Sequence, residues 1–140
     1  MERYHELKNI FGKLFSNIIV SNEWTIDNSF HAVLGALLKT NYIDAGERKK
    51  PRLHYIICQK SGTGKDPIMK LCVNLVKKTT GNDTAHLLGL DVTSSTLIGG
   101  VEERYDGKKL QRQVISGALQ KYRLLAWSEG QSLLEAAHTG

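Results

Sequence analysis

Apolar residues recur at every third or fourth position near the start of the chain, which is the spacing of one face of an α-helix. The spacing predicts an amphipathic helix over residues 2–20 and a second helix over Phe30–Lys39, separated by a polar break at Ser21–Ser29. Ser29 can cap the second helix, because a serine hydroxyl accepts a hydrogen bond from a free backbone N–H of the first turn. The first stripe consists of Tyr4, Leu7, Phe11, Leu14 and Ile18. It can belong to the core or form a surface for a partner, and the pattern leaves both interpretations open.

A short apolar run, Leu53–Cys58, stops at a glycine-rich turn, and a helical pattern begins at Lys65. The run predicts a buried strand. The apolar residues of the helix that follows fall on one face and are Ile68, Leu71, Cys72, Leu75 and Val76. A strand, a Gly-Lys turn and a helix, in this order, are the context of a phosphate-binding loop.

The turn has the chemistry that a phosphate chain requires. Glycines let the backbone approach the anion, and the exposed N–H groups at the start of the helix point towards it. Lys65 would reach the β- and γ-phosphates as a point charge. The predicted nucleotide-binding residues are Gln59, Lys60, Ser61, Gly62, Thr63, Gly64, Lys65 and Asp66. The sequence therefore predicts a site for a nucleoside triphosphate, with the alternative that the turn only joins a strand to a helix.

Two positions depart from the full pattern G-x-x-x-x-G-K-[ST]. Gln59 replaces the first glycine, and Asp66 replaces the serine or threonine. An uncompensated carboxylate at position 66 would repel the phosphates. A structural interpretation of Asp66 also exists, because the helix dipole favours an acid near the start of a helix and Pro67 is suited to the first turn.

The second half of the chain alternates short apolar runs with turn signals. Strands are predicted at Ala85–Leu90 and Tyr122–Trp127, and a helix over Leu110–Gln120. Thr93–Thr96 offers capping hydroxyls before a short helix that Gly99 closes. The remaining expected features are a turn at Thr79–Asp83, an exposed segment at Glu102–Lys109 that turns at Asp106-Gly107, and a last helix at Gln131–Ala137.

A hydroxyl and an acid, Ser128 and Glu129, follow the third predicted strand. In P-loop ATPases an acidic pair stands there, of which the first acid supports Mg²⁺ and the second polarises the attacking water. Glu129 is therefore the candidate catalytic glutamate, acting with Lys65. In the usual site the phosphate loop supplies a hydroxyl ligand to Mg²⁺ and the strand supplies a carboxylate. Here the loop carries the carboxylate of Asp66 and the strand is followed by the hydroxyl of Ser128, so the ion could keep both oxygen ligands. The alternative is that both metal ligands are lost, which would leave a nucleotide binder or an inert fold.

Length and charge limit the possible partners. The chain has 140 residues, one domain's length, and 19 Lys+Arg against 14 Asp+Glu give a net charge of +5. This excess permits a DNA partner, and the charged loop at Asp44–Arg52 is either a nucleic-acid contact or solvated surface. Cys58 and Cys72 lie in apolar segments without metal-ligand spacing, so both are expected to be reduced core thiols. No apolar run approaches the ~20 residues that span a bilayer, and the chain does not start with a signal peptide, so we expect a cytoplasmic protein without a membrane partner.

Several stretches together resemble a known family. They are Phe30–Lys39, Ser61-Gly62-Thr63-Gly64-Lys65, Gly89-Leu90-Asp91-Val92-Thr93-Ser94-Ser95-Thr96, Gly117-Ala118-Leu119 and Leu124–Glu129. Their layout resembles the ATPase domain of phage and plasmid primase–helicases and, more distantly, the minichromosome maintenance helicases. The likeness covers roughly residues 30–137, and the phosphate loop is its specific motif.

The resemblance implies an α/β fold, a three-layer P-loop NTPase core with a mainly parallel sheet over residues 51–140 and a helical portion over residues 1–50, as one compact unit. It implies ATP and Mg²⁺ as cofactors, and DNA unwinding or translocation in the replication of a mobile element by a homo-oligomer of the full-length protein. Further strands, a sensor residue and an arginine finger would follow Gly140, so we expect an amino-terminal fragment with weak or no hydrolysis. A non-catalytic nucleotide-binding or assembly module and a P-loop kinase are the alternatives.

Overall fold

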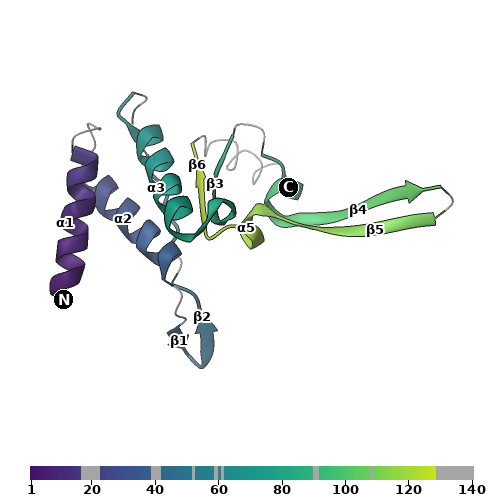
Figure 1. Ribbon diagram of the computed structural model, residues 1–140, viewed down its shortest axis with the longest axis horizontal. Helices are drawn as coiled ribbons and strands as arrows, with labels where there is room; N and C mark the ends of the chain where they lie inside the picture. Colours follow the sequence, from purple (N-terminus) through teal and green to yellow (C-terminus); the bar gives the residue numbers. More distant parts are fainter. Residues whose placement is uncertain are drawn as a thin grey trace.

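The computed structural model describes residues 1–16, 23–38, 42–51, 53–58, 60, 62–89, 92–107 and 109–128. Figure 1 shows three longer helices side by side, a short strand pair next to the third helix, and a long two-stranded ribbon that extends from the opposite end. The elements are α1 (Glu2–Ser16), α2 (Glu23–Leu37), β1 (Tyr42–Asp44), β2 (Glu47–Lys49), α3 (Lys65–Thr80), the 3₁₀ turn η1 (Asn82–Thr84), β3 (Ala85–Leu88), α4 (Ser94–Ile98), β4 (Gly99–Asp106), β5 (Lys109–Ser116), α5 (Ala118–Lys121) and β6 (Leu124–Trp127).

Aromatic side chains join α1 to α2. Phe11 and Phe15 are buried with ring centroids 4.3 Å apart, and the ring of Phe30 lies 5.3 Å from that of Phe11. The hydroxyl of Tyr4 lies 2.6 Å from Nε2 of His31. The helical spacing of these residues thus buries one face of α1, because burial of apolar area is the main stabilising term.

The core continues from α2 into α3 and the strand pair. The buried apolar cluster includes Val33 and Ala36 of α2 and Ile68, Cys72 and Val76 of α3. The predicted apolar face of α3 is therefore confirmed.

β3 and β6 form a parallel pair in which Ala85 is opposite Leu124 and Leu88 is opposite Trp127. Ala85 belongs to the core cluster, and Leu87, Leu124 and Ala126 pack against it, so the face that these four residues share is turned towards α3. The chain is thus a mixed α/β protein with a parallel strand pair. The two other described strand pairs, β1–β2 and β4–β5, are antiparallel hairpins.

The direction of α3 follows from its connection to β3. Gly81 ends α3, and its N–H donates to the carbonyl of Lys77 before η1 leads into β3. At the same end of the sheet the N–H of Arg123 donates to the carbonyl of Thr84, 2.7 Å away. Because α3 ends where β3 begins and packs along both strands, it runs antiparallel to them, as Figure 1 shows. The start of α3 therefore lies at the carboxyl end of β3 and β6.

The hairpin β4–β5 is exposed along almost its whole length, with Gly99 alone half-buried among its described residues. One of its faces carries Val101, Tyr105, Leu110 and Val114, and Glu103 pairs with Arg112 in the middle of this face at 2.7 Å. Figure 1 shows it projecting away from the body of the molecule, so its side chains lie outside the core.

The helix predicted over Leu110–Gln120 is wrong. Residues 109–116 form a strand, and α5 begins only at Ala118. The turn at Asp106-Gly107 is confirmed, since Asp106 pairs with Lys109 and Gly107 has a φ of +64°. Leu110 and Val114 are four residues apart, a spacing that fits one face of a helix or of a strand, and pairing with the partner strand β4 decides the outcome.

The second helix begins earlier than its sequence pattern predicts. α2 starts at Glu23, so the polar break at Ser21–Ser29 is wrong within the described residues, and Ser29 lies buried inside the helix instead of capping it. Thr25 is buried on the same helix. Packing against the rest of the core outweighs the low helix propensity of these hydroxyl residues. Residues 17–20 and Lys39, where the two predicted helices would end, lie outside the described residues.

The segment between α2 and α3 also differs from the prediction. Leu53–Cys58 forms no strand, and Leu53 and Ile56 are 52% and 75% exposed. An apolar run becomes a strand only where a neighbour completes its hydrogen-bond ladder, and among the described residues β3 and β6 pair only with each other. The charged loop expected at Asp44–Arg52 overlaps the hairpin β1–β2, because β1 ends at Asp44 and β2 lies inside the expected loop.

Other predictions in the second half are confirmed. β3 and β6 lie within the predicted strands, and Thr93 caps α4 by accepting a hydrogen bond from the N–H of Thr96. The last predicted helix, Gln131–Ala137, lies outside the described residues. None of the described helices has the length and apolar content that a membrane span requires.

Candidate phosphate-binding site

The turn before α3 has left-handed backbone at two glycines. Gly62 has a φ of +78° and Gly64, the residue that precedes the first helical turn, has a φ of +89° and a ψ of +13°. Residues with a Cβ adopt this conformation at a cost, so glycine is the natural residue at both positions. Between them, the hydroxyl of Thr63 donates to the carbonyl of Lys60 at 2.6 Å, which closes the turn on itself.

The first turn of α3 has no side-chain cap. Gly64 has no side chain that could accept a hydrogen bond from the start of the helix, and no capping bond is formed there. Pro67 has no N–H, and the N–H of Ile68 already donates to the carbonyl of Gly64 at 3.4 Å. The N–H groups of Lys65 and Asp66 have no hydrogen-bond acceptor within the described part of the chain, and they lie at the positive end of the helix dipole, where an anion is stabilised.

Charged side chains stand next to these donors. Lys65 is half-buried in the first turn of α3, and Lys60 is exposed on the other side of the turn. Asp66 is exposed, so water can solvate its carboxylate. Among the described residues, the turn and the first turn of α3 thus carry two lysine charges and one carboxylate charge.

The carboxyl end of β6 lies at the same end of the molecule as this turn, because α3 runs antiparallel to β3 and β6. Ser128 follows β6 directly and is half-buried. In open α/β sheets, ligands bind outside the carboxyl ends of the parallel strands. Asp66 and Ser128, which lie far apart in the sequence, therefore both lie towards the same end of the molecule.

The donor chemistry of Asp66 and Ser128 suits Mg²⁺, which prefers oxygen ligands and takes few from the protein when phosphates supply others. The described residues contain no cluster of three or more His, Cys, Asp or Glu side chains that could hold a metal. A carboxylate and a hydroxyl thus leave most of the coordination sphere to phosphate and water.

Several predicted site residues cannot be placed. Gln59, Ser61 and Glu129 lie outside the described residues. The segment that leads into the turn, Leu53–Cys58, has no strand partner, and Cys58 is exposed, so its prediction as a core thiol is wrong. Cys72 is a free, buried thiol, as predicted.

One polar group at this edge has no counterpart in the sequence-based site. The indole Nε1 of Trp127 is buried and has no hydrogen-bond partner within the described part of the chain. Trp127 immediately precedes Ser128 and lies on the strand face opposite to that of Ala126. In the sequence this residue only marks the end of a predicted strand, because nothing in the local pattern indicates whether an indole N–H finds a partner.

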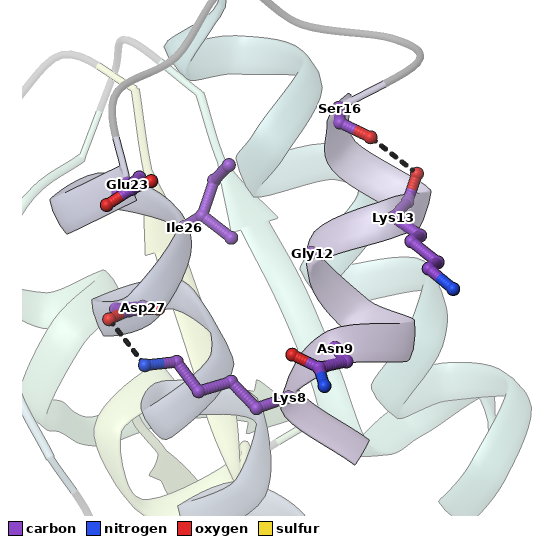
Figure 2. A pocket seen from close by; sticks show the side chains of 8 residues that line it. All are labelled: Lys8, Asn9, Gly12, Lys13, Ser16, Glu23, Ile26 and Asp27. Carbon is purple, nitrogen blue, oxygen red and sulfur yellow. Dashed lines mark hydrogen bonds and ion pairs between the residues drawn. The ribbon is translucent and has the colours of Figure 1, made fainter. Parts of the chain in front are cut away.

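A groove of about 550 Å³ lies elsewhere, between α1 and α2. Figure 2 shows that Lys8 crosses it towards Asp27, and the two charged groups are 2.7 Å apart. This contact raises the pKa of Lys8, and the hydrogen bond to Asp27 is the largest cause of the shift. The groove carries charges of both signs and lacks the glycine turn, so we do not assign the phosphate site to it. Its lining residues are Lys8, Asn9, Gly12, Lys13, Ser16, Glu23, Ile26 and Asp27.

Comparison of the chain with protein-family models, with curated proteins and with solved structures gave no match.

Proposed function

We propose that the chain binds ATP together with Mg²⁺ at the start of α3, as the phosphate-binding part of a P-loop NTPase core. One observation carries the proposal. An uncapped helix start, preceded by Gly62 and Gly64 in left-handed backbone, lies at the carboxyl end of the parallel strands β3 and β6. This arrangement presents free N–H groups and Lys65 to an anion at the sheet edge where nucleotides bind in α/β folds.

Each residue then has a role that follows from its chemistry. The backbone of Gly62–Asp66 cradles the phosphates, and the ammonium group of Lys65 neutralises their charge. Gln59, Lys60 and Ser61 complete the loop. Asp66 and Ser128 supply the two protein ligands of Mg²⁺, which offsets the charge that Asp66 would otherwise direct at the phosphates. Glu129 orients the attacking water in hydrolysis.

The wider proposal is an ATPase that drives DNA unwinding or translocation in the cytoplasm, as part of a longer, oligomeric protein with a three-layer core. It rests on the resemblance to primase–helicases. The glycine turn and the start of α3 support its nucleotide-binding half, although Leu53–Cys58 does not form the strand that precedes such a turn in P-loop folds.

A second candidate is a nucleotide-binding or assembly module that does not catalyse hydrolysis. It is favoured by Leu53–Cys58, which enters the turn without pairing to β6. A catalytic phosphate loop must be held within a fraction of an ångström, and a strand in the sheet is the usual support. Without it, binding can persist while turnover is lost.

Binding of a fluorescent ATP analogue, with and without Mg²⁺, tests the proposal. Lys65→Ala should raise the dissociation constant about 10- to 100-fold, because a hydrogen bond to a charged group is lost. Lys70→Ala is the matched control, since Lys70 is an exposed lysine of the same helix, and it should leave the affinity unchanged. Equal losses in both variants, or no binding by the folded native chain, would contradict the proposal.

Turnover separates the two candidates. Glu129→Gln removes the base and keeps the size of the side chain, so an ATPase should retain nucleotide affinity and lose hydrolysis. A native chain that binds ATP but hydrolyses it no faster than Glu129→Gln is the non-catalytic module.

A further inference from the structure

α1 has a second apolar face besides the one that packs on α2. Leu7, Ile10 and Leu14 follow each other at spacings of three and four, and they are 52%, 51% and 44% exposed. At 3.6 residues per turn they form a line roughly a quarter of a turn from the face that holds Phe11 and Phe15. The apolar surface of α1 is therefore wider than the part of it that α2 covers. We call these three residues the outer stripe.

The position of α1 leaves the outer stripe accessible. α1 is the outermost helix of the molecule, and the ribbon β4–β5 projects from the opposite end, as Figure 1 shows. Three large apolar side chains in line on an exposed helix form the type of surface that partner helices cover.

Two opposite charges flank the outer stripe on its side away from α2. Glu6 and Lys13 are both exposed and stand seven residues, about two helical turns, apart. Neither forms an ion pair within the described part of the chain. Figure 2 shows Lys13 extending from the side of α1 that faces away from α2, whereas Lys8 extends towards Asp27.

We propose that the outer stripe packs against the outer stripe of a second copy of this chain, with the two α1 helices antiparallel. A two-fold axis between Leu7 and Ile10 places Leu7 against Ile10 of the second copy, and the reverse. It also places Glu6 beside Lys13 of the second copy, again twice. A two-fold contact of this kind is self-complementary, because the same surface serves both subunits.

The charges select the antiparallel orientation. In a parallel pair the two-fold axis runs along the helices, so Glu6 and Lys13 of one copy lie on the opposite side of the contact from those of the second copy and do not meet them. In the antiparallel pair Glu6 and Lys13 of the two copies lie on the same side of the contact, where two Glu6–Lys13 pairs form, and this favours the antiparallel orientation. The stem of Arg3 can cover Leu14 of the second copy while its charged head stays in water.

Charge exchange combined with a measurement of oligomeric state tests the proposal. The native chain should show a reversible monomer–dimer equilibrium in sedimentation equilibrium. Glu6→Lys alone and Lys13→Glu alone should each raise the dimer dissociation constant about tenfold, because two attractive pairs become repulsive. The double variant Glu6→Lys/Lys13→Glu should restore the native value. All these residues are exposed, so circular dichroism should show an unchanged fold.

Two apolar variants locate the contact. Ile10→Glu should abolish the dimer, and Val114→Glu, at a 79% exposed site on the ribbon, should leave it intact. The proposal is overturned by a native chain that stays monomeric up to its solubility limit, or by a double charge variant no stronger than the single ones. It is equally overturned by a dimer that Val114→Glu disrupts and Ile10→Glu does not.

Discussion

Gly99 and Gly117 meet at the base of the β4–β5 ribbon so closely that neither has room for a side chain. A Cβ on Gly99 would lie 2.5 Å from the backbone nitrogen of Gly117 and would overlap the carbonyl oxygen of Ile115. A Cβ on Gly117 would overlap the backbone of Leu97 and of Gly99. Backbone atoms cannot move aside as flexible side chains can, so this base requires two glycines.

Substitutions at this base should therefore destabilise the fold. Gly99→Ala adds an overlap and a strained φ of +89°, and Gly117→Ala adds an overlap alone, so each should lower the free energy of unfolding by about 1–3 kcal/mol. The matched control is Gly100→Ala, whose Cβ would meet nothing within 4 Å and which should change stability by less than about 0.5 kcal/mol. Urea unfolding followed by tryptophan fluorescence measures all three. Equal effects at the three positions would show that the base is not closely packed.

The stability of the protein should fall in alkaline solution through Cys72. Burial raises the pKa of this thiol from 9.0 to about 12, against a smaller opposing effect of the hydrogen bond with Ser29. Below pH 9 the thiol is protonated in both states, so its contribution to stability is fully present. Above pH 9 the unfolded chain releases the proton and the folded chain keeps it, so stability is lost progressively up to about pH 12.

The effect is measured as a difference between two proteins. Between pH 8.5 and 10.5 the free energy of unfolding should fall by about 2 kcal/mol more for the native chain than for Cys72→Ala. Lysine and tyrosine titrations are common to both proteins and cancel in this comparison. Parallel pH profiles of the two proteins would show that the thiol is not desolvated in the fold.

The two thiols should differ strongly in reactivity. The thiolate is the reactive form, so exposed Cys58 should react with a thiol reagent at pH 8 and buried Cys72 should not. We expect one labelled thiol per native chain and two in denaturant. Cys58→Ser should reduce the native number to none, and Cys72→Ala should leave it at one. Similar labelling rates for both cysteines would place Cys72 at the surface.

The exchange of metal ligands between Asp66 and Ser128 predicts coupling between these two sites. Asp66→Thr alone should weaken Mg²⁺-dependent binding of the ATP analogue, because one carboxylate ligand is lost. Ser128→Asp in the same chain should restore it, since the carboxylate then approaches the ion from β6. Asp83→Thr removes an exposed acid at the opposite end of α3 and serves as the control. Additive effects of the two changes would rule out a shared ion.

The parts of the fold that follow from sequence are those where local signals agree. Gly64 before the helix, Pro67 in its first turn and the apolar face from Ile68 to Val76 all indicate α3, and the structure has it at Lys65–Thr80. Residues 85–88 and 124–127 are short apolar runs between turns, and each forms a strand of the parallel pair. No distant contact is needed to recognise these elements.

The errors occur where a distant partner decides the conformation. The pattern of Leu110–Gln120 fits both a helix and a strand, and pairing with β4 selects the strand. Leu53–Cys58 has the composition of a strand, but its pairing depends on a neighbour that the local sequence does not specify. Thr25 and Ser29 indicate a break by propensity alone, yet both are buried in α2.

The candidate site divides in the same way. The glycine turn and Lys65 are recognisable from sequence, because the spacing within one loop is fixed by the chain itself. Whether Asp66 and Ser128 lie at one edge depends on the direction of α3 relative to β6, which only the packed fold defines. The burial of the Trp127 indole N–H, which has no hydrogen-bond partner among the described residues, also results from packing.

The close contact at the base of the ribbon determines which parts of this segment can vary in length and sequence. The ribbon leaves the body of the molecule at Gly99 and returns to it at Gly117, and these two residues are in contact. The segment between them is therefore an insertion whose two ends meet at one point of the fold. β3 and β6 would meet in the same register if a tight loop joined the two glycines, because the ribbon contributes no residue to the core cluster. Its length and outer sequence can therefore vary, or be replaced by a foreign hairpin, at little expense to the fold, while the two glycines that close it cannot.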